Sequence, residues 1–387
     1  MDIASQPIPR LKKPLHVLSI HLARQYAKLY DSSKFIGVIG SVGKEAAVEA
    51  CKSVLSQKYK TITTKSNIDP ILNITKAILG MTPNIQKCVL EMETRYLGEM
   101  DFYLSLVKPK TVIVTNISYD DSQFLGSLED VIFEKAKLLK QLPEDGVAIL
   151  NWDDLETRKL SNKSKGSVVY FGCNPESCTI WAGNIKVEDF KTCFELNLGV
   201  ERVRVTYNLL GKNQLYSALA AAALGVVFDI PLTKIKIALE SIEGLEDRLQ
   251  VVSGPSGSTI LSDAYNSSPS TVEEAIETLI EIPARRRVAV IGEIRELGRF
   301  SDTLHRGVAR KLYKEKIDLV FLGTGDALII ADELKNLGFL EERVEANLQN
   351  SQLVAKLLKS LGKGDVCLIS GSIANRLDEV VKRIAKK

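Results

Sequence analysis

Histidine is scarce in this chain, and its scarcity excludes several kinds of catalytic site. The 387 residues contain only His16, His21 and His305, so chemistry that depends on several histidines, such as a three-histidine metal site, is excluded. His16 and His21 fall in an expected amphipathic helix near the N-terminus, where a structural role is the simplest interpretation.

Cysteine is also sparse, which argues against a disulfide framework. The six cysteines form no C-x-x-C pair and lack the density of a small disulfide-bonded domain. Cys173, Cys178 and Cys193 leave a zinc site open as a minor alternative. Free, reduced thiols in a cytoplasmic protein are the favoured interpretation.

Long apolar runs and an excess of one charge are missing as well. No segment reaches the roughly 18 apolar residues that span a bilayer, and the N-terminal stretch MDIASQPIPRLKKP has no apolar region of the kind a secretory signal carries. With 51 Lys and Arg against 48 Asp and Glu the formal net charge is +3, and no basic stripe predicts a nucleic-acid partner. We expect a cytoplasmic protein without membrane insertion.

What the chain does contain is a phosphate-loop pattern in residues 35–50, FIGVIGSVGKEAAVEA. An apolar strand runs from Phe35 to Ile39 into Gly40-Ser41-Val42-Gly43-Lys44 and then into an alanine-rich helix. Glycines let the backbone amides turn toward one anion, the helix start adds positive potential, and the lysine reaches the outer phosphates. The pattern predicts a nucleoside-triphosphate site. The next position, where Ser or Thr normally holds Mg²⁺, is Glu45, so the motif is a variant.

Strands and helices alternate along most of the chain, which is typical of parallel sheets covered by helices on both faces. Residues 160–210 differ, with short Val, Thr, Tyr and Phe runs broken by Gly, Asn and Pro, and they predict a small antiparallel subdomain. We therefore expect an α/β protein of three parts. An N-terminal extension with one helix covers 1–33, a three-layer phosphate-loop domain with the small β subdomain covers 34–243, and a Rossmann-like domain covers 244–387.

Individual elements follow from the same pattern. The arginine run 285–287 precedes one of the strands and is expected in a solvated loop. The expected strands lie at 35–39, 60–64, 87–92, 111–115, 147–150, 258–262, 287–291, 318–322 and 365–369, and helices are expected at 43–57, 70–80, 127–142, 213–227 and 232–242.

Ligand-binding side chains gather at the carboxyl ends of parallel strands, and this rule selects a few residues. Glu91 ends one expected strand, and its carboxylate suits Mg²⁺. Asn116 follows another strand with Asp121 shortly after it, and the helix over 127–142 carries Lys135. Taken singly, all but Glu91 are better explained as solvated loop residues or as charges on a helix face.

Taken together, the motifs resemble the ATP-dependent Mur ligases, in the family's order and near its spacing over about residues 20–385. Within the family they are nearest to the member that joins D-alanyl-D-alanine to UDP-N-acetylmuramoyl-tripeptide. The matching blocks are GSVGK (40–44), LEM (90–92) with GE (98–99), TNI (115–117), GSLE (126–129), LNWDD (150–154), DAYNSSP (263–269), GEIRELG (292–298) with His305, and GD (364–365) with GS (371–372).

The resemblance implies an ATP-dependent ligase that activates a carboxylate as an acyl phosphate and joins it to an amine, with ATP and Mg²⁺ as cofactors. Its partners would be a peptide-bearing cell-wall precursor and an amino acid or dipeptide, and the enzyme would act as a monomer. The nucleotide would lie between the two larger domains.

The resemblance also implies roles for particular residues. Lys44, Glu91 and Lys135 would be catalytic. The metal ligands would be Glu91, Asp121 and a carbamylated Lys135, with Glu45 as an additional candidate. The residues implied to bind ATP are Gly40, Ser41, Val42, Gly43, Lys44, Glu45, Asn116, Gln214, Arg248, Asp263, Tyr265 and Asn266.

The chain departs from the family pattern at several positions. Glu45 replaces the Mg²⁺-binding hydroxyl, Ser370 stands where the family has a lysine, and Glu93 occupies a glycine position. Asp69-Pro70 interrupts the family's substrate loop. Because only 34 residues precede the first expected strand, we expect the family's N-terminal UDP-sugar-binding domain to be absent.

Two classes of function therefore stay open. An active amide ligase for a cell-wall precursor is favoured by the retained Lys44, Glu91, Asn116 and Lys135. A catalytically degenerate, ATP-binding relative that serves as a scaffold or partner is favoured by Glu45 and Ser370. A ligase for a different acid, such as a polyglutamate or cofactor tail, is a third and smaller alternative.

Overall fold

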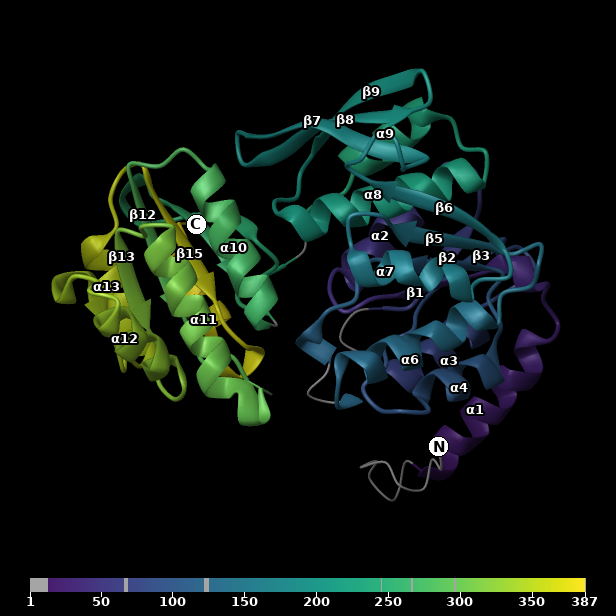
Figure 1. Ribbon diagram of the computed structural model, residues 1–387, viewed down its shortest axis with the longest axis horizontal. Helices are drawn as coiled ribbons and strands as arrows, with labels where there is room; N and C mark the ends of the chain where they lie inside the picture. Colours follow the sequence, from purple (N-terminus) through teal and green to yellow (C-terminus); the bar gives the residue numbers. More distant parts are fainter. Residues whose placement is uncertain are drawn as a thin grey trace. The chain divides into compact units, whose positions relative to one another are not determined.

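The protein folds as two compact α/β units (Figure 1). The structure, a computed structural model, describes residues 13–65, 69–121, 125–244, 246–265, 267–295 and 297–386. The first unit comprises the described residues of 13–185, 193–206 and 213–242, and the second comprises those of 186–192, 207–212 and 243–386. The predicted α/β class is confirmed, and we propose that the two units correspond in outline to domains at 34–243 and 244–387.

The chain up to residue 240 builds a long mixed sheet with helices around it. Its helices are α1 (Lys13–Ala27), α2 (Lys44–Leu55), α3 (Pro70–Leu79), α4 (Glu99–Leu106), α6 (Leu128–Lys140), α7 (Leu155–Lys159), α8 (Lys212–Val227) and α9 (Leu232–Glu240). Its strands are β1 (Phe35–Ile39), β2 (Thr61–Thr63), β3 (Lys87–Glu91), β4 (Thr111–Val114), β5 (Val147–Asn151), β6 (Ser167–Gly172), β7 (Ile180–Glu188), β8 (Lys191–Leu198) and β9 (Glu201–Tyr207).

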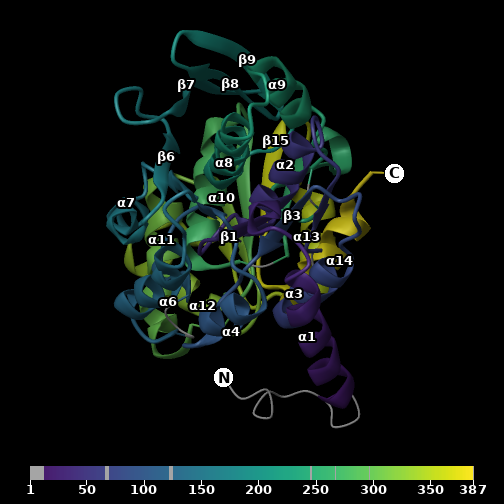
Figure 2. The same ribbon diagram turned by 90° about the vertical axis from the view of Figure 1, so that its right-hand side faces the viewer.

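Strand β1 lies in the middle of the parallel part of this sheet. The strand order is β2-β3-β1-β4-β5-β6-β7-β8-β9, and β1 pairs in parallel with β3 and β4. All five residues of β1 are buried, as expected for a strand covered by helices on both faces. Phe35 and Ile39 pack with α1, α3, α4 and α6 in one core, and Figures 1 and 2 show these helices together on one side of the sheet.

The region 160–210, where the sequence predicts a small antiparallel subdomain, continues the sheet of the first unit, and its first strand pairs in parallel rather than antiparallel. Strand β6 pairs in parallel with β5, where Leu150 is the register partner of Tyr170, and β7, β8 and β9 continue the same sheet. Short runs of β-forming residues indicate strands but not their partners. Here the open edge of β5 is covered by β6, which leaves no unpaired backbone edge at that position.

The Asp69-Pro70 pair begins helix α3. The Asp69 side chain accepts a hydrogen bond from the Leu72 amide at 3.1 Å, and Pro70 is the first residue of the helix. An acidic cap followed by proline is a common way to begin a helix. This departure from the family pattern therefore starts an element rather than merely interrupting a loop.

The second unit is a smaller sheet between two helical layers. Its helices are α10 (Pro269–Glu281), α11 (Ser301–Lys314), α12 (Ala327–Asn336), α13 (Asn350–Ser360) and α14 (Leu377–Ile384). Its strands are β10 (Gln250–Ser253), β11 (Thr259–Asp263), β12 (Arg286–Ile291), β13 (Leu319–Leu322), β14 (Val344–Glu345) and β15 (Asp365–Ser370), in the order β10-β11-β15-β12-β13-β14. All neighbouring strands are parallel except β10, which pairs antiparallel with β11.

Alternate strand residues of this unit enter two separate cores. Leu261 and Leu368 pack in the core that also contains residues of α10, α11 and α12. Ile260 and Cys367, their neighbours in sequence, pack in the core that contains residues of α13 and α14. This period of two is the pattern of a sheet buried on both faces.

The arginine run 285–287 is not a solvated loop, so that prediction is wrong. Arg286 Nη2 lies 2.7 Å from Asp365 Oδ2, and Arg285 Nη2 lies 2.9 Å from Asp365 Oδ1. Arg287 donates to the carbonyl oxygens of Leu279, Ile280 and Ile282 at the end of α10. The run attracts these acceptors because the fully buried Asp365 carboxylate and a helix C-terminus both need cationic donors.

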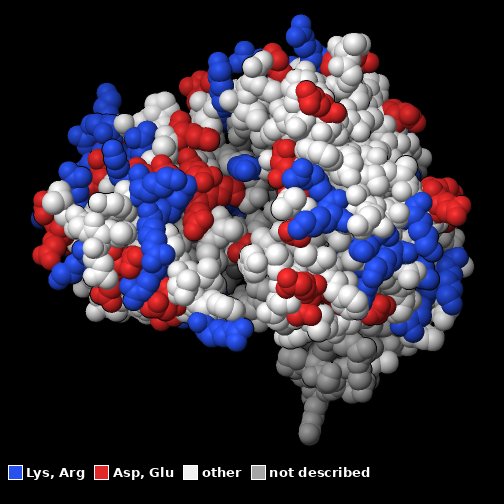
Figure 3. Space-filling model, in the orientation of Figure 1, with Lys and Arg blue, Asp and Glu red and all other residues white. Residues whose placement is uncertain are grey.

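Charge is mixed on the surface of each unit. On the face drawn in Figure 3, Lys and Arg side chains lie among Asp and Glu side chains without a field of one sign. This distribution agrees with the formal net charge of +3. Among the described helices, none has the length and apolar character that a bilayer crossing requires.

We expect Asp365→Ala to lower the free energy of unfolding of the second unit by about 3 kcal/mol at pH 7, because two guanidinium groups lose their carboxylate. Burial alone would raise the pKa of Asp365, but hydrogen bonds from Arg286, Gly362 and Arg285 lower it overall. A carboxyl group with a lowered pKa stabilises the fold above its unfolded-state pKa and loses that contribution as the pH falls.

The difference between wild type and Asp365→Ala should therefore shrink below about pH 4. Urea unfolding at pH 7 and pH 3 measures it. Glu341→Ala removes an exposed ion pair with Lys335 and is the control, with an expected change below about 0.5 kcal/mol. Equal losses in the two variants would contradict the argument.

Candidate active site

The phosphate loop lies at the carboxyl end of β1 and depends on two glycines. A Cβ added to Gly40 would lie 1.9 Å from Thr115 Oγ1, so no larger residue fits there. Gly43 has φ 78° and precedes the first residue of α2. This left-handed conformation is available to glycine at little cost, and it turns the chain from strand into helix.

Residues that follow β4 hold the loop by its backbone. The Asn116 side-chain Oδ1 accepts hydrogen bonds from the amides of Ser41 at 3.1 Å and Val42 at 2.8 Å. Thr115 Oγ1 donates to the Val42 carbonyl at 2.7 Å. The Ser41 amide also reaches the Asn116 carbonyl at 3.0 Å. The TNI block is therefore a clamp that fixes the shape of the loop.

Two buried lysines lie against the same loop from different helices. Lys44 of α2 donates to the Ser41 carbonyl, with Nζ and O 3.1 Å apart. Lys135 of α6, only 1% exposed, donates to the Gly40 carbonyl at 2.9 Å. The fold thus brings together Lys44, Lys135 and Asn116, which are far apart in sequence. Two ammonium groups beside a glycine loop create a site for an anion.

The predicted metal ligands are described in part. Glu91 is the half-buried last residue of β3, and its amide donates to Thr64 Oγ1 at 3.0 Å. Glu45 is the half-buried second residue of α2, where a carboxylate also favours the helix start. The side chain of Asp121 and the whole of Asn266 lie outside the described residues. Within the described ranges, no group of three or more His, Cys, Asp or Glu side chains is placed to hold a metal ion.

The start of α8 also contacts the loop. The Ser217 hydroxyl lies 3.1 Å from the Gly43 carbonyl oxygen and 2.8 Å from the Asn213 carbonyl oxygen, and these two acceptors share its single proton. One turn earlier, Gln214 is 9% exposed, and its Oε1 atom is buried without a hydrogen-bond partner. A buried acceptor without a donor is costly, so Gln214 is suited to accept a hydrogen bond from a ligand.

Arg248, Asp263 and Tyr265 form a second cluster, within the second unit. The Arg248 guanidinium stacks on the Tyr265 ring at 4.4 Å from the ring centroid. Ser370 Oγ donates to Asp263 Oδ2 at 3.0 Å. Burial raises the pKa of Asp263 to about 6, against the opposing effects of Arg248, the Ser370 hydroxyl and the Leu249 amide.

Several supporting residues were not assigned a role from the sequence. Asn151 Nδ2 donates to the Thr115 carbonyl at 2.8 Å, and Asp154 Oδ1 accepts from the Ile117 amide at 3.2 Å. The fully buried Glu134, next to Lys135, accepts from the amides of Gly98 and Met100 at 3.1 and 2.7 Å. Asn151 and Asp154 belong to the LNWDD block that carries the family resemblance, whereas nothing in the sequence pointed to Glu134.

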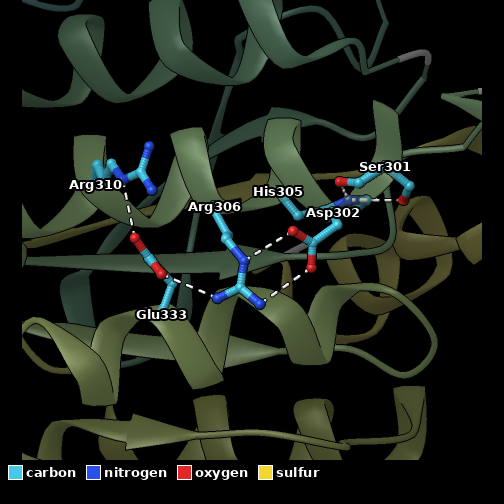
Figure 4. A network of polar contacts seen from close by, with 6 residues as sticks. All are labelled: Ser301, Asp302, His305, Arg306, Arg310 and Glu333. Carbon is cyan, nitrogen blue, oxygen red and sulfur yellow. Dashed lines mark hydrogen bonds and ion pairs between the residues drawn. The ribbon is translucent and has the colours of Figure 1, made fainter. Parts of the chain in front are cut away.

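His305 is a structural residue. Its Nε2 accepts from the Ile294 amide at 3.2 Å, so the proton resides on Nδ1, which donates to the Ser301 carbonyl at 2.8 Å. The ring is fully buried. Figure 4 shows it beside Ser301 and next to the network in which Arg306 joins Asp302 and Glu333. With both nitrogens engaged in the fold, His305 has no site for substrate chemistry.

Sequence comparison identifies two family domains in the chain. The description "Mur ligase middle domain" matches residues 38–225, and "Mur ligase, glutamate ligase domain" matches residues 247–373. Together they cover most of the chain.

Relatives and solved structures agree with this match. The UDP-N-acetylmuramoyl-tripeptide–D-alanyl-D-alanine ligase of Bacillus subtilis is 28% identical over 93% of this chain and 78% of its own length. The ligase of the same name from Escherichia coli is 27% identical over 91% of this chain and 77% of its own length. MurF from Acinetobacter baumannii superimposes with a TM-score of 0.86 at 21% identity, over 96% of this chain and 81% of that one. MurF from Thermotoga maritima, solved in complex with ADP, superimposes with a TM-score of 0.82 at 21% identity. The match covers 95% of this chain and 83% of that one.

The structural likeness shows the fold, and the family domains show the relationship. The predicted resemblance is confirmed, and so is the class of activity, that of an ATP-dependent ligase that forms carbon–nitrogen bonds. The chain belongs to the Mur ligase family.

Proposed function

We propose that this chain uses ATP to join D-alanyl-D-alanine to the peptide of a UDP-N-acetylmuramoyl-tripeptide in peptidoglycan synthesis. The observation that supports it most is the loop at Gly40–Lys44, which is clamped by Asn116 and flanked by two buried lysines. The curated relatives carry this activity in their names. The scaffold alternative has less support, because both lysines and the clamp are in place.

The proposed reaction has two steps. A carboxylate oxygen of the peptide attacks the γ-phosphorus of ATP, which forms an acyl phosphate and releases ADP. The amino group of the dipeptide then attacks the acyl carbon, phosphate leaves with the shared oxygen, and the nitrogen loses a proton. Lys44 and the loop lie where they would balance the negative charge of the transferring phosphoryl group.

Mg²⁺ fits the residues present. This ion is usually bound by one or two carboxylates together with phosphate oxygens and water, so it needs no cage of three protein ligands. Glu91 would hold it, with Glu45 and Asp121 as further candidates, and the ion would neutralise charge on the phosphates. Lys135 is proposed to become a ligand when carbamylated.

Two groups of residues are proposed to recognise the nucleotide. Gln214, whose buried Oε1 lacks a hydrogen-bond partner, would accept a hydrogen bond from the nucleotide. Arg248, Asp263, Tyr265 and Asn266 are also proposed to contact it. The cytoplasmic location and the monomeric state stay predictions.

Lys44→Ala should abolish ATP binding, because the side chain reaches the loop carbonyl where the outer phosphates are proposed to bind. Isothermal titration calorimetry with Mg·ATP measures the loss. Lys52→Ala, on the same helix and paired with Glu49 at the surface, should bind like wild type. If wild type itself gives no Mg·ATP heat, the ligase proposal fails and the scaffold alternative replaces it.

Substitutions of Glu45 distinguish a metal contact from a lost site. A carboxylate about 4 Å from a phosphate charge costs on the order of 4 kcal/mol at an effective dielectric constant near 20, unless a cation lies between them. If Glu45 binds Mg²⁺, Glu45→Thr should keep ATP turnover similar, whereas Glu45→Ala should lower it strongly and raise the Mg²⁺ requirement. If Glu45 only repels phosphate, both variants should bind ATP more tightly, and the metal-contact assignment is then wrong.

The whole reaction can be tested directly. Incubation with ATP, UDP-N-acetylmuramoyl-tripeptide and D-alanyl-D-alanine should yield ADP and a pentapeptide product, detected by mass spectrometry. Without dipeptide, added hydroxylamine should trap the acyl phosphate as a hydroxamate. ADP release with L-glutamate as acceptor, but not with D-alanyl-D-alanine, would contradict the proposed acceptor in favour of a different ligase.

A further inference from the structure

The carboxyl edge of the second sheet contains a buried chain of hydroxyl groups. Asp263 ends β11 and is the register partner of Ser370, which ends β15. Ser370 is fully buried and Ser267 is 5% exposed. Their Oγ atoms are 3.0 Å apart, and Ser370 Oγ is 3.0 Å from Asp263 Oδ2. Two side chains at strand ends, Asp263 and Ser370, and one in the following loop, Ser267, are thus linked in a row.

The direction of these hydrogen bonds follows from the number of protons. An ionised carboxylate only accepts, so Ser370 must donate its single hydroxyl proton to Asp263. Because that proton is then used, Ser267 is the donor in its contact with Ser370 at 3.0 Å, and the Asp263 carbonyl, 3.4 Å away, is the more distant acceptor of the same Ser267 proton. Hydrogen bonds in such a chain polarise and strengthen one another. The chain therefore stabilises the negative charge on the Asp263 carboxylate at its end.

The charged groups that face Asp263 are Arg248, which attracts it, and Asp247, which repels it. Asp247 is itself held by the Ser262 hydroxyl at 2.6 Å and faces Lys382 of α14. Since Arg248 also stacks on Tyr265, the Asp263 carboxylate is coupled to two other residues that are proposed to bind the nucleotide. In this chain, a neutral donor stands at position 370, where the family resemblance implies a lysine.

We propose that Ser370 and Ser267 are positioning residues whose hydroxyl chain keeps the Asp263 carboxylate charged and oriented beside Arg248. This inference rests on the proposed function, because Arg248 and Tyr265 are assigned to ATP there. Ser370 donates directly to the carboxylate, and Ser267 supports Ser370 through the second hydrogen bond of the chain. When Asp263 is protonated, Arg248 loses its charged partner, so the affinity for ATP decreases as the pH falls through the titration of Asp263.

The direct test is a pH titration of Asp263 in the full chain, in which carbon-13 NMR of its carboxyl group measures the midpoint. Ser370→Ala should raise the midpoint by about one pKa unit, which is the size expected when a carboxylate loses one hydrogen bond. Ser267→Ala should raise it less, because it removes only the second bond of the chain. Ser370→Thr keeps the hydroxyl and should restore the wild-type midpoint.

Ser258→Ala is the matched control. Ser258 is also buried, and its hydroxyl binds the Pro255 carbonyl beside the opposite end of β11. It should leave the Asp263 midpoint unchanged. A midpoint that stays at the wild-type value in both Ser370→Ala and Ser267→Ala, or that moves equally in Ser258→Ala, would overturn the inference. If one variant fails to fold, the other decides.

A functional measurement separates this inference from the proposed function. In wild type the KM for ATP should rise below the Asp263 midpoint, and in Ser370→Ala the rise should begin about one pH unit higher while kcat at pH 8 stays near wild type. If wild type binds no ATP, the proposed function fails. The NMR titration alone then decides whether the hydroxyl chain stabilises the Asp263 carboxylate. If ATP binds and the pH profile does not move, the role in positioning is wrong.

Discussion

Hydrogen bonds between Thr115 and Asn116 and the backbone of the phosphate loop determine how the loop, Lys44 and Lys135 are arranged. Two amides and one carbonyl of the loop are engaged there, and an unsatisfied buried amide would cost about 1–3 kcal/mol. With the loop fixed, its remaining carbonyls point toward the two lysines. The parallel pairing of β1 with β4 brings the clamp to the loop, so the site follows from sheet topology.

Local signals made much of the site predictable. Gly40, Gly43 and Lys44 are adjacent in sequence, and the glycines reveal the turn that the backbone must make. Glu91 and Asn116 could be placed because each follows a strand and the carboxyl ends of parallel strands meet at one edge. The two-sheet α/β fold followed from the alternation of strands and helices.

Long-range contacts explain what the sequence did not reveal. No local pattern distinguishes the buried Glu134 from its helical neighbours, because the two backbone amides that it binds lie about 35 residues earlier in the chain. The region 160–210 was predicted to be antiparallel, whereas β6 pairs in parallel with β5, because residue types indicate strands and not their pairing. The arginine run was misjudged because its acceptor, Asp365, is 80 residues away from Arg285.

Three of the departures from the family pattern make interactions of their own in the fold. Glu45 places a negative charge in the first turn of α2, which stabilises the helix start without nucleotide and must be balanced when phosphate binds. Ser370 replaces a cation by a hydrogen bond to Asp263. Asp69-Pro70 begins α3. Glu45, Ser370 and the Asp69-Pro70 pair therefore each have a structural role in this fold.

The most direct measurement of the central claim follows one oxygen atom. A peptide substrate with oxygen-18 in its reacting carboxylate should transfer one labelled oxygen to inorganic phosphate, seen as an isotope shift in phosphorus-31 NMR, because the acyl phosphate shares that oxygen. Amide formation with label in the phosphate is the predicted result. Unlabelled phosphate, with ATP consumed in the presence of both substrates, would contradict the account.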